Sequence, residues 1–144
     1  MKFYFCGSMT FDRSKLYDYQ KMIAKLKEFG SVLNEFVGEE KMKDTLPLDE
    51  FNQDVANLKI ADMLVADITV PSTGVGFEIG YFLRENKPML LLYEQDKPLP
   101  SSLVRGIEKS LVLSYKDIDD ALVKIAEFVR NAKWYKCLHF FIDF

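Results

Sequence analysis

The chain alternates between short apolar runs and longer segments in which apolar residues recur at helical spacing. The runs predict buried β-strands, and the spaced segments predict α-helices. The predicted strands are Lys2–Cys6, Ser31–Val37, Met63–Ile68, Pro88–Tyr93 and Leu111–Ser114. The predicted helices run from about Leu16 to Phe29, from Pro47 to Ile60, and over Val75–Arg84, Ser101–Lys109 and Ile118–Val129.

Regular alternation of strands and helices is typical of a parallel sheet whose crossover helices cover both faces. The run P-M-L-L-L-Y at 88–93 fits this arrangement, because a strand buried on both faces is apolar at every position. We therefore predict a single-domain α/β fold, an open five-stranded parallel sheet with helices on both faces, flavodoxin- or Rossmann-like. Ligands of such sheets bind beyond the carboxyl ends of the strands.

Ala66–Gly80, with the sequence A-D-I-T-V-P-S-T-G-V-G-F-E-I-G, is the most informative stretch of the chain. It has the pattern of a buried strand end, a polar turn and a helix start. Glu78 lies two residues after Gly76, where a glycine-rich turn would otherwise invite a phosphate onto the helix N-terminus. Glu78 is either a first-turn acid favoured by the helix dipole or a carboxylate nucleophile that faces the sugar of a substrate.

Composition narrows the class of protein. The 144 residues suffice for one domain, and 49% hydrophobic and 28% charged residues are typical of a globular protein. The net charge of −3 gives no support to a nucleic-acid-binding surface. The N-terminal apolar run is too short for a signal peptide, and no segment is long enough to span a membrane. Cys6 and Cys137 lie far apart in sequence, so we expect no disulfide framework and a cytoplasmic location.

Several kinds of active site do not fit the residues present. The single histidine, His139, argues against a His-based triad or a His metal site, and two distant cysteines make no zinc motif. The segment G-V-G-F-E-I-G has Ile79 where the dinucleotide fingerprint needs glycine. Carboxylates, hydroxyls and backbone N–H groups remain, so we predict neither a metal nor an organic cofactor.

This inventory fits cleavage of a glycosidic bond, in which one carboxylate attacks the anomeric carbon and another protonates the leaving group. Asp54 and Glu78 precede and follow the third predicted strand and form the candidate pair. In a retaining enzyme such a pair stands about 5–5.5 Å apart. Asp67, at the end of that strand, is predicted to orient the following turn by hydrogen bonds to its N–H groups.

Four motifs then carry a resemblance to a known family. They are Y-F-C-G-S (Tyr4–Ser8), D-V-A-N-L-K-I-A-D (Asp54–Asp62), P-S-T-G-V-G-F-E-I-G (Pro71–Gly80) and S-S-L-V-R-G (Ser101–Gly106). Together they resemble the 2'-deoxynucleoside 5'-phosphate N-hydrolases of the nucleoside 2-deoxyribosyltransferase superfamily. The resemblance runs from Lys2 to about Val129, so we expect one domain over residues 1–132. The aromatic tail, 133–144, is expected to pack on the domain or on a neighbouring subunit.

The resemblance implies a reaction and roles for single residues. Glu78 would be the nucleophile that forms a deoxyribosyl-enzyme intermediate, and Asp54 the acid that assists departure of the base and then activates water. Tyr4 would lie near the sugar and disfavour a 2'-hydroxyl. Ser101 would be supplied to the phosphate by the other subunit of a homodimer. The implied substrate-binding residues are Tyr4, Gly7, Ser8, Met9, Thr10, Arg13, Tyr19, Ser72, Gly74, Ser101, Ser102 and Leu103.

Positions 72 and 101 favour the hydrolases over the transferases within this superfamily. The transferases usually have a carboxylate and an asparagine there to hold a nucleoside's hydroxyl groups, whereas this chain has Ser72 and Ser101. Serine can donate to a 5'-phosphate that a carboxylate would repel. We therefore predict hydrolysis of 2'-deoxynucleoside 5'-monophosphates. The alternatives are deoxyribosyl transfer between bases and a nucleotide-binding module without catalysis.

The chain also departs from the hydrolase pattern. The hydrolases tend to carry an R-G-G-R-like segment after G-S, and here the segment is Met9-Thr10-Phe11-Asp12-Arg13, which keeps only Arg13. Phe36 stands where a histidine is common. These differences bear on phosphate affinity and base preference, and the Met9–Asp12 segment is what motivates the non-catalytic alternative.

Overall fold

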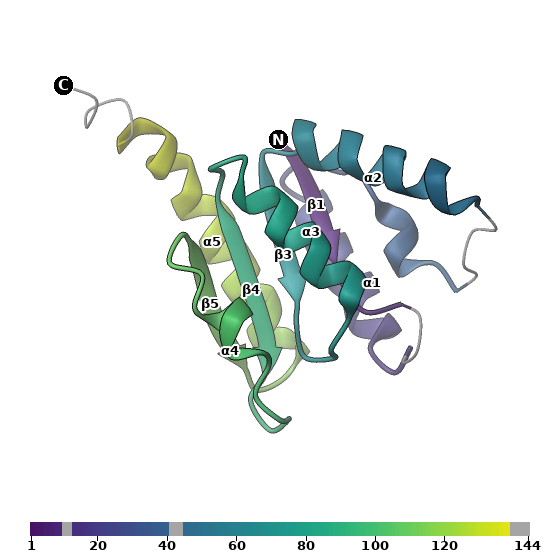
Figure 1. Cartoon of the computed structure of the whole chain (residues 1–144). Helices are drawn as coiled ribbons and strands as arrows, with labels where there is room; N and C mark the ends of the chain where they lie inside the picture. Colours follow the sequence, from purple (N-terminus) through teal and green to yellow (C-terminus); the bar gives the residue numbers. More distant parts are fainter. Residues whose placement is uncertain (10–12, 41–44, 139–144) are drawn as a thin grey trace.

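The computed structural model has a five-stranded parallel sheet in the order β2-β1-β3-β4-β5 (Figure 1). It describes residues 1–9, 13–40 and 45–138, and side chains as far as residue 132. The strands are β1 (Lys2–Cys6), β2 (Ser31–Val32), β3 (Met63–Asp67), β4 (Met89–Glu94) and β5 (Ser110–Tyr115). The helices are α1 (Leu16–Lys27), the 3₁₀ helix η1 (Glu35–Gly38), α2 (Pro47–Ile60), α3 (Thr73–Leu83), α4 (Ser102–Arg105) and α5 (Ile118–Leu138). The predicted fold class is confirmed.

The two faces of the sheet are covered by different helices (Figure 1). Alternate residues of a strand point to opposite faces. In β1, Phe3 and Phe5 pack with α1 and α5, whereas Tyr4 and Cys6 pack with α2 and α3. The same alternation turns the end of β3 toward α1 and α5, because Met63 and Val65 belong to that cluster. The carboxyl edge of the sheet therefore presents two separate groups of side chains.

The second strand is much shorter than predicted. It ends at Val32, and the chain then turns into η1. The reason is Asn34, which is 1% exposed and hydrogen-bonds both polar backbone groups of Phe5 through its side chain. Its Oδ1 accepts from the Phe5 N–H at 2.9 Å, and its Nδ2 donates to the Phe5 carbonyl at 2.6 Å. A side-chain amide thus replaces the strand pairing, and Phe36 lies in η1 instead of a strand.

The last helix is longer than predicted. The prediction ended it at Val129, whereas α5 continues to Leu138. Residues 130–138 contain neither proline nor glycine, so nothing in the sequence stops the helix at residue 129. The expected boundary at residue 132 falls inside α5, and packing of the tail stays a prediction. Within the described residues no helix, α5 included, has the length and apolar character needed to cross a membrane.

Helix α2 turns out to be less buried than its apolar positions suggested. Of Phe51, Val55, Leu58 and Ile60, only Leu58 is buried, and Phe51 remains 49% exposed. Phe51 instead lies against Phe77 of α3, with ring centroids 5.8 Å apart. Helices α2 and α3 thus share an aromatic contact at the surface, next to the two carboxylates predicted to act in catalysis.

Candidate active site

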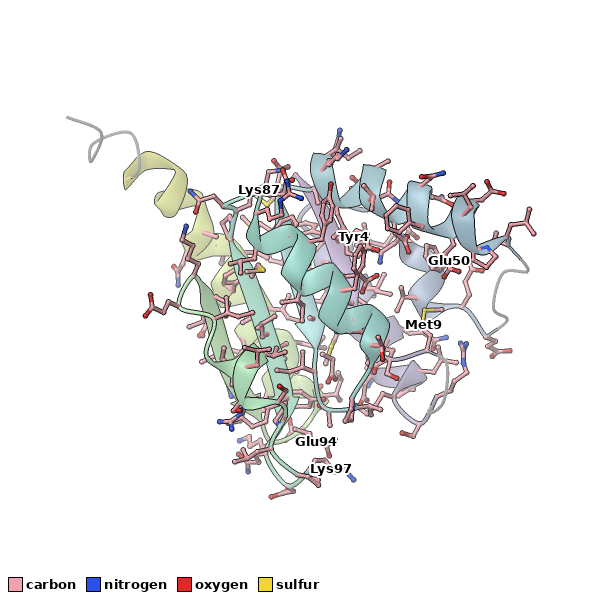
Figure 2. All side chains as sticks on the ribbon, viewed as in Figure 1. Tyr4, Met9, Glu50, Lys87, Glu94 and Lys97 are labelled. Atoms are coloured by element: carbon pink, nitrogen blue, oxygen red, sulfur yellow. The ribbon has the colours of Figure 1, made fainter. Side chains whose placement is uncertain are left out.

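Tyr4 of β1 meets Glu78 of α3. The Tyr4 side chain is fully buried, and its hydroxyl donates a hydrogen bond to Oε1 of Glu78 at 2.7 Å. Helix α3 is held on the sheet by Val75, Ile79 and Phe82, which are buried at helical spacing. Glu78 precedes Ile79 and therefore lies at the border of this packed face, where it reaches β1. Figure 2 shows Tyr4 in the space between α2 and α3.

The Glu78 carboxyl group is unusual in its pKa. Burial raises this pKa from 4.5 to about 7, against the hydrogen bonds from Tyr4 and Cys6, which lower it. The negative charges of Asp54 and Glu50 raise it further. Desolvation and like charge both disfavour the ionised form, whereas hydrogen-bond donors favour it. A carboxyl group with a pKa near neutrality can change its protonation state under working conditions, which is typical of active sites.

Asp54 of α2 completes a pair of carboxylates around Tyr4. Asp54 is half-buried, and burial raises the pKa of its carboxyl group. A hydrogen bond with Tyr4 lowers that pKa, and the charge of Glu50 raises it. The Tyr4 hydroxyl interacts with both Glu78 and Asp54, so the two predicted catalytic residues meet at one phenol.

The loop after β1 forms a narrow crevice with α1 and η1. It is lined by Ser8, Met9, Arg13, Leu16, Tyr19 and Val37. Nη2 of Arg13 donates to the Glu39 carbonyl, and Nη1 is buried without a hydrogen-bond partner among the described residues. A Cβ at Gly7 would lie 2.7 Å from the Tyr19 ring, so only glycine fits there. Four predicted substrate-binding residues therefore come together, and the Arg13 guanidinium has donor capacity to spare.

Ser72, Gly74 and Ser101 meet in a separate hollow of about 460 Å³ at the N-terminal end of α3. Ser72 is the N-cap of α3, and its Oγ accepts from the Val75 N–H at 3.4 Å. Its hydroxyl proton is free to be donated outward. Ser101 is the N-cap of α4 but makes no cap hydrogen bond within the described residues. Both hydroxyls can therefore donate to a ligand in the hollow.

Tyr19, although it lines the crevice, and the remaining predicted residues are less closely tied to the site. The Tyr19 ring is a core residue, 1% exposed and packed edge-on against Phe5. Ser102 and Leu103 open α4 on the surface, and Leu103 is 83% exposed. Thr10 lies outside the described residues. No cluster of three metal-ligating side chains occurs in the described part of the chain.

The profile of the family described as Nucleoside 2-deoxyribosyltransferase matches residues 3–132. The chain belongs to the nucleoside 2-deoxyribosyltransferase family. The match includes Tyr4, Asp54, Glu78 and both serines of the hollow. The resemblance noted on the four motifs is thereby confirmed.

Relatives within the nucleoside 2-deoxyribosyltransferase family are named as hydrolases. A protein of Thermofilum pendens, named as a candidate 2'-deoxynucleoside 5'-phosphate N-hydrolase 1, is 37% identical over 87% of this chain and 92% of its own length. The 5-hydroxymethyl-dUMP N-hydrolase of Tetraodon nigroviridis is 34% identical over 92% of this chain and 100% of its own length. Both alignments span nearly the whole of each protein.

Solved structures confirm the fold. The Clostridium botulinum CMP N-glycosidase BcmB superposes with a TM-score of 0.71, covers 89% of this chain and 99% of its own, and is 21% identical. The solution structure of BlsM gives a TM-score of 0.75 at 23% identity, with 91% and 90% covered. At these identities the superpositions establish a shared architecture.

Two side chains that lie around Glu78 were not predicted from the sequence to belong to the site. Cys6 is 1% exposed and hydrogen-bonds Glu78, and Glu50 raises the pKa of both Asp54 and Glu78. Spacing could have indicated both of them. Cys6 is two residues after Tyr4 on a strand, and Glu50 is four residues before Asp54 on a helix, so each pair shares a face.

Proposed function

We propose that this protein hydrolyses the N-glycosidic bond of 2'-deoxynucleoside 5'-monophosphates to free nucleobase and 2-deoxyribose 5-phosphate. The observation that supports it most is that Glu78 and Asp54 both interact with the Tyr4 hydroxyl. Two carboxylates with raised pKa values at the carboxyl edge of a parallel sheet are the groups that glycosidic cleavage needs. The names of the relatives point to the same bond.

In the first step, an oxygen of ionised Glu78 attacks C1' of the deoxyribose. The bond from C1' to the base nitrogen breaks, its electron pair goes to the base, and protonated Asp54 delivers a proton to that base. The buried Tyr4 side chain, whose hydroxyl contacts the Glu78 carboxylate, is proposed to favour a sugar without a 2'-hydroxyl. The product of this step is an ester between Glu78 and 2-deoxyribose 5-phosphate.

In the second step, Asp54 takes a proton from water and the resulting hydroxide attacks C1'. The ester bond breaks, Glu78 leaves as a carboxylate, and Asp54 is again protonated. A second nucleobase in place of water would give deoxyribosyl transfer. The choice of hydrolysis over transfer rests on the two serines of the hollow, because a phosphate on the substrate, which serine favours, marks the hydrolase branch.

The phosphate is proposed to bind at the N-terminus of α3. The unpaired N–H groups of a helix N-terminus and its partial positive charge attract anions. Ser72 is the N-cap of this eleven-residue helix, and Gly74 lines the same hollow. Arg13, with a buried and unpaired Nη1, can supply a charge from the loop after β1. No organic cofactor takes part in either step.

A homodimer is proposed to complete the site, in which Ser101, which lines the hollow of its own chain, also reaches the phosphate site of the neighbouring subunit. Apolar side chains around this region are left uncovered, among them Leu103 and Phe77. A Cβ at Gly76 or Gly80 of α3 would meet no described atom within 4 Å, although an exposed helical glycine costs roughly 1 kcal/mol relative to alanine. A second chain that packs closely on α3 would account for both features.

The proposed function is tested by incubating the protein with each deoxynucleoside monophosphate and each deoxynucleoside, with and without a second free base, and separating the products by chromatography. Release of base from monophosphates alone is the expected result. A new nucleoside or nucleotide formed with the second base would establish transfer instead. No turnover at high enzyme concentration would establish a binding module.

The shared site is tested by mixing two variants, Glu78→Gln and Ser101→Ala, at subsaturating substrate. A mixed dimer pairs the intact Glu78 of one chain with the intact Ser101 of the other, so activity should rise above that of either variant alone. No gain on mixing, in a preparation that sedimentation shows to be dimeric, would mean that each site uses its own Ser101.

A further inference from the structure

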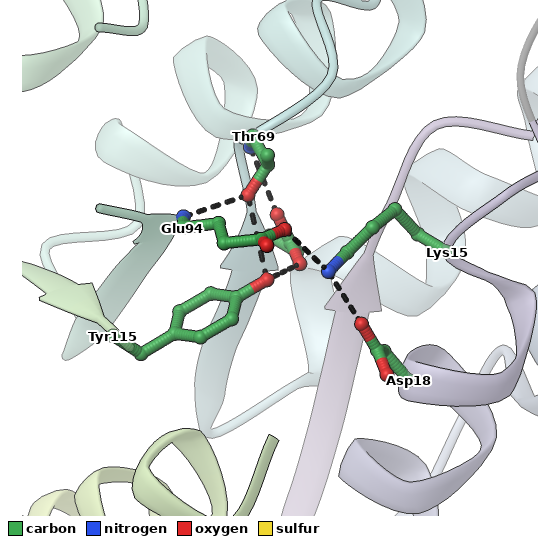
Figure 3. A network of polar contacts seen from close by, with 6 residues as sticks. Lys15, Asp18, Thr69, Glu94 and Tyr115 are labelled. Carbon is green, nitrogen blue, oxygen red and sulfur yellow. Dashed lines mark hydrogen bonds and ion pairs between the residues drawn. The ribbon is translucent and has the colours of Figure 1, made fainter. Parts of the chain in front are cut away.

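A second polar cluster lies at the carboxyl edge of the sheet, on the face covered by α1 and α5 (Figure 3). We call it the edge network. It joins the ends of β3, β4 and β5 to the start of α1, and the proposed reaction uses none of its side chains. Its members are Lys15, Asp18, Asp67, Thr69, Glu94 and Tyr115.

Asp67 and Thr69 fix the start of the loop between β3 and α3. Asp67 is fully buried, and its Oδ1 accepts from the Thr69 N–H at 2.8 Å. This hydrogen bond confirms the predicted role of Asp67 in orienting the turn. The Thr69 hydroxyl accepts from the Glu94 N–H at 3.0 Å, which ties the loop to the end of β4. Ser72 follows Thr69 by three residues, so this attachment lies just ahead of the proposed phosphate site.

Tyr115 connects β5 to Asp67 at the end of β3. It is the last residue of β5, is 1% exposed, and donates to Oδ2 of Asp67 at 2.7 Å. Its hydroxyl also lies 3.5 Å from the Thr69 hydroxyl. Both Asp67 oxygens thereby accept hydrogen bonds inside the protein, and the Asp67 side chain has no exposed surface.

Lys15 connects the network to the other substrate loop. Its Nζ lies 5.3 Å from the centre of the Tyr115 ring, donates to Oε2 of Glu94 at 3.1 Å, and also donates to Asp18. Lys15 is 7% exposed and occupies the N-cap position of α1, two residues after Arg13. The network therefore links the loop that contains Arg13 with the loop that contains Ser72.

Stability alone does not account for polar groups at this position. Buried ion pairs lose solvation about as large as their mutual attraction, so well-packed apolar residues often do as well for stability. Directional hydrogen bonds differ from apolar packing in that they fix distance and angle. A network at this position thus holds two loops at a set separation.

We propose that Tyr115 is a positioning residue for substrate binding, which holds the Ser72 and Arg13 loops at the spacing that a deoxynucleotide requires. The proposal rests on the proposed function, since it takes these two loops as the sugar-phosphate site. Tyr115 acts through Asp67 and Lys15, and touches no reacting group.

The proposal predicts a specific split between binding and chemistry. Glu78 is held by Tyr4 and by the packing of Val75 and Ile79, so the loop can shift without moving the nucleophile. In Tyr115→Phe, only the hydroxyl is lost and Asp67 keeps one donor. We expect KM for deoxynucleoside monophosphates to rise roughly five- to twentyfold, while kcat changes less than about threefold.

The matched control is Tyr93→Phe. Tyr93 is at the end of β4, pairs in register with Ser114, and packs on the opposite face of the sheet, outside the network. Loss of the Tyr93 hydroxyl should leave KM within about twofold of the wild-type value. Thr69→Val, which removes the acceptor for Glu94, should repeat the rise in KM and serves if Tyr115→Phe folds poorly.

The experiment combines steady-state kinetics, calorimetric binding of 2-deoxyribose 5-phosphate, and amide hydrogen exchange of the free proteins. In Tyr115→Phe we expect faster exchange in peptides covering both 68–75 and 13–19, weaker binding of the sugar phosphate, and the KM rise. Unchanged exchange in the 13–19 peptide, or unchanged KM and binding, in both network variants overturns the proposal. A wild type without turnover would refute the proposed function alone, because exchange and sugar-phosphate binding still report on the loops.

Discussion

Two acids, the buried Asp67 and the partly buried Glu78, lie on opposite faces of the same sheet edge, and their surroundings differ. Asp67 has a donor on each oxygen, from Thr69 and Tyr115, and both donors belong to a closed network. Glu78 has Tyr4 on one oxygen, has Cys6 and a second carboxylate nearby, and has a pKa of about 7. Burial raises the pKa of both groups.

The difference separates a structural acid from a reactive one. A fully buried carboxylate with a hydrogen-bond donor on each oxygen fixes its neighbours and has no surface open to a ligand. A buried carboxylate beside a like charge is held at high free energy and gains from any change that disperses its charge, such as bond formation to a sugar. Burial alone does not identify a catalytic acid, whereas the balance of donors and like charges does.

The largest predicted effect is on kcat, and it distinguishes Glu78 from Asp67. Glu78→Gln removes the nucleophile but keeps the shape of the side chain, so kcat should fall by at least about 10³-fold. Binding of a deoxynucleoside monophosphate, followed by calorimetry, should stay within about threefold. Asp67→Asn is the control and should retain kcat within about tenfold. If Glu78→Gln kept more than a hundredth of wild-type kcat, the assignment of the nucleophile would be wrong.

Asp54→Asn is predicted to have the next largest effect. Loss of a general acid and base should reduce kcat about 10²–10⁴-fold. The active form has protonated and therefore uncharged Asp54, so the acid limb of the pH–rate profile, which reports ionisation of Glu78, should remain in the variant. The alkaline limb, which reports loss of the Asp54 proton in the coupled pair, should disappear. A profile of Asp54→Asn with both limbs intact would assign the acid to another group.

The smallest predicted effect is on the free energy of unfolding. Substitution of Glu78 and substitution of Asp67 should change it in opposite directions. The folded-state pKa of Glu78 lies above its unfolded value of 4.5, so its contribution to stability is present below pH 4.5 and is lost as pH rises through about 7. Glu78→Gln should therefore gain roughly 1–3 kcal/mol in free energy of unfolding, relative to the wild type, between pH 5 and pH 8.

Asp67→Asn should behave in the opposite way. It places an amide N–H₂ opposite donors that need acceptors, at a cost of about 1–3 kcal/mol at pH 7. Both variants are compared with the wild type by urea unfolding at each pH. A destabilised Glu78→Gln at pH 8, or an Asp67→Asn as stable as the wild type, would remove the distinction between the two acids.

Sequence predicted the architecture well because the apolar periodicity is local. It could not predict the end of β2, since Asn34 replaces strand pairing through a contact with Phe5, twenty-nine positions away. It predicted the Asp54–Glu78 pair through order along the chain and a family resemblance. The contact of both with the Tyr4 hydroxyl appears only when β1 and α3 are packed together.

The edge network could not be predicted from the sequence, for a similar reason. Lys15, Asp67 and Tyr115 are separated by about fifty residues each, and none belongs to a recognisable motif. Their contact depends on which face the last residue of each strand takes, and the register of β4 with β5 decides this for Tyr115. Asp67 alone was predicted to have an orienting role, because its hydrogen bond to Thr69 is local.

The most direct test of the account is detection of the covalent intermediate. The wild type is mixed with a deoxynucleoside monophosphate, quenched in acid within milliseconds, digested with trypsin and analysed by mass spectrometry. We predict that a 2-deoxyribose 5-phosphate ester appears on Glu78 within the peptide Ile60–Arg84, and is absent from Glu78→Gln. An ester on Asp67 or Asp54, or turnover that continues with no ester on Glu78 at any quench time, would contradict the account.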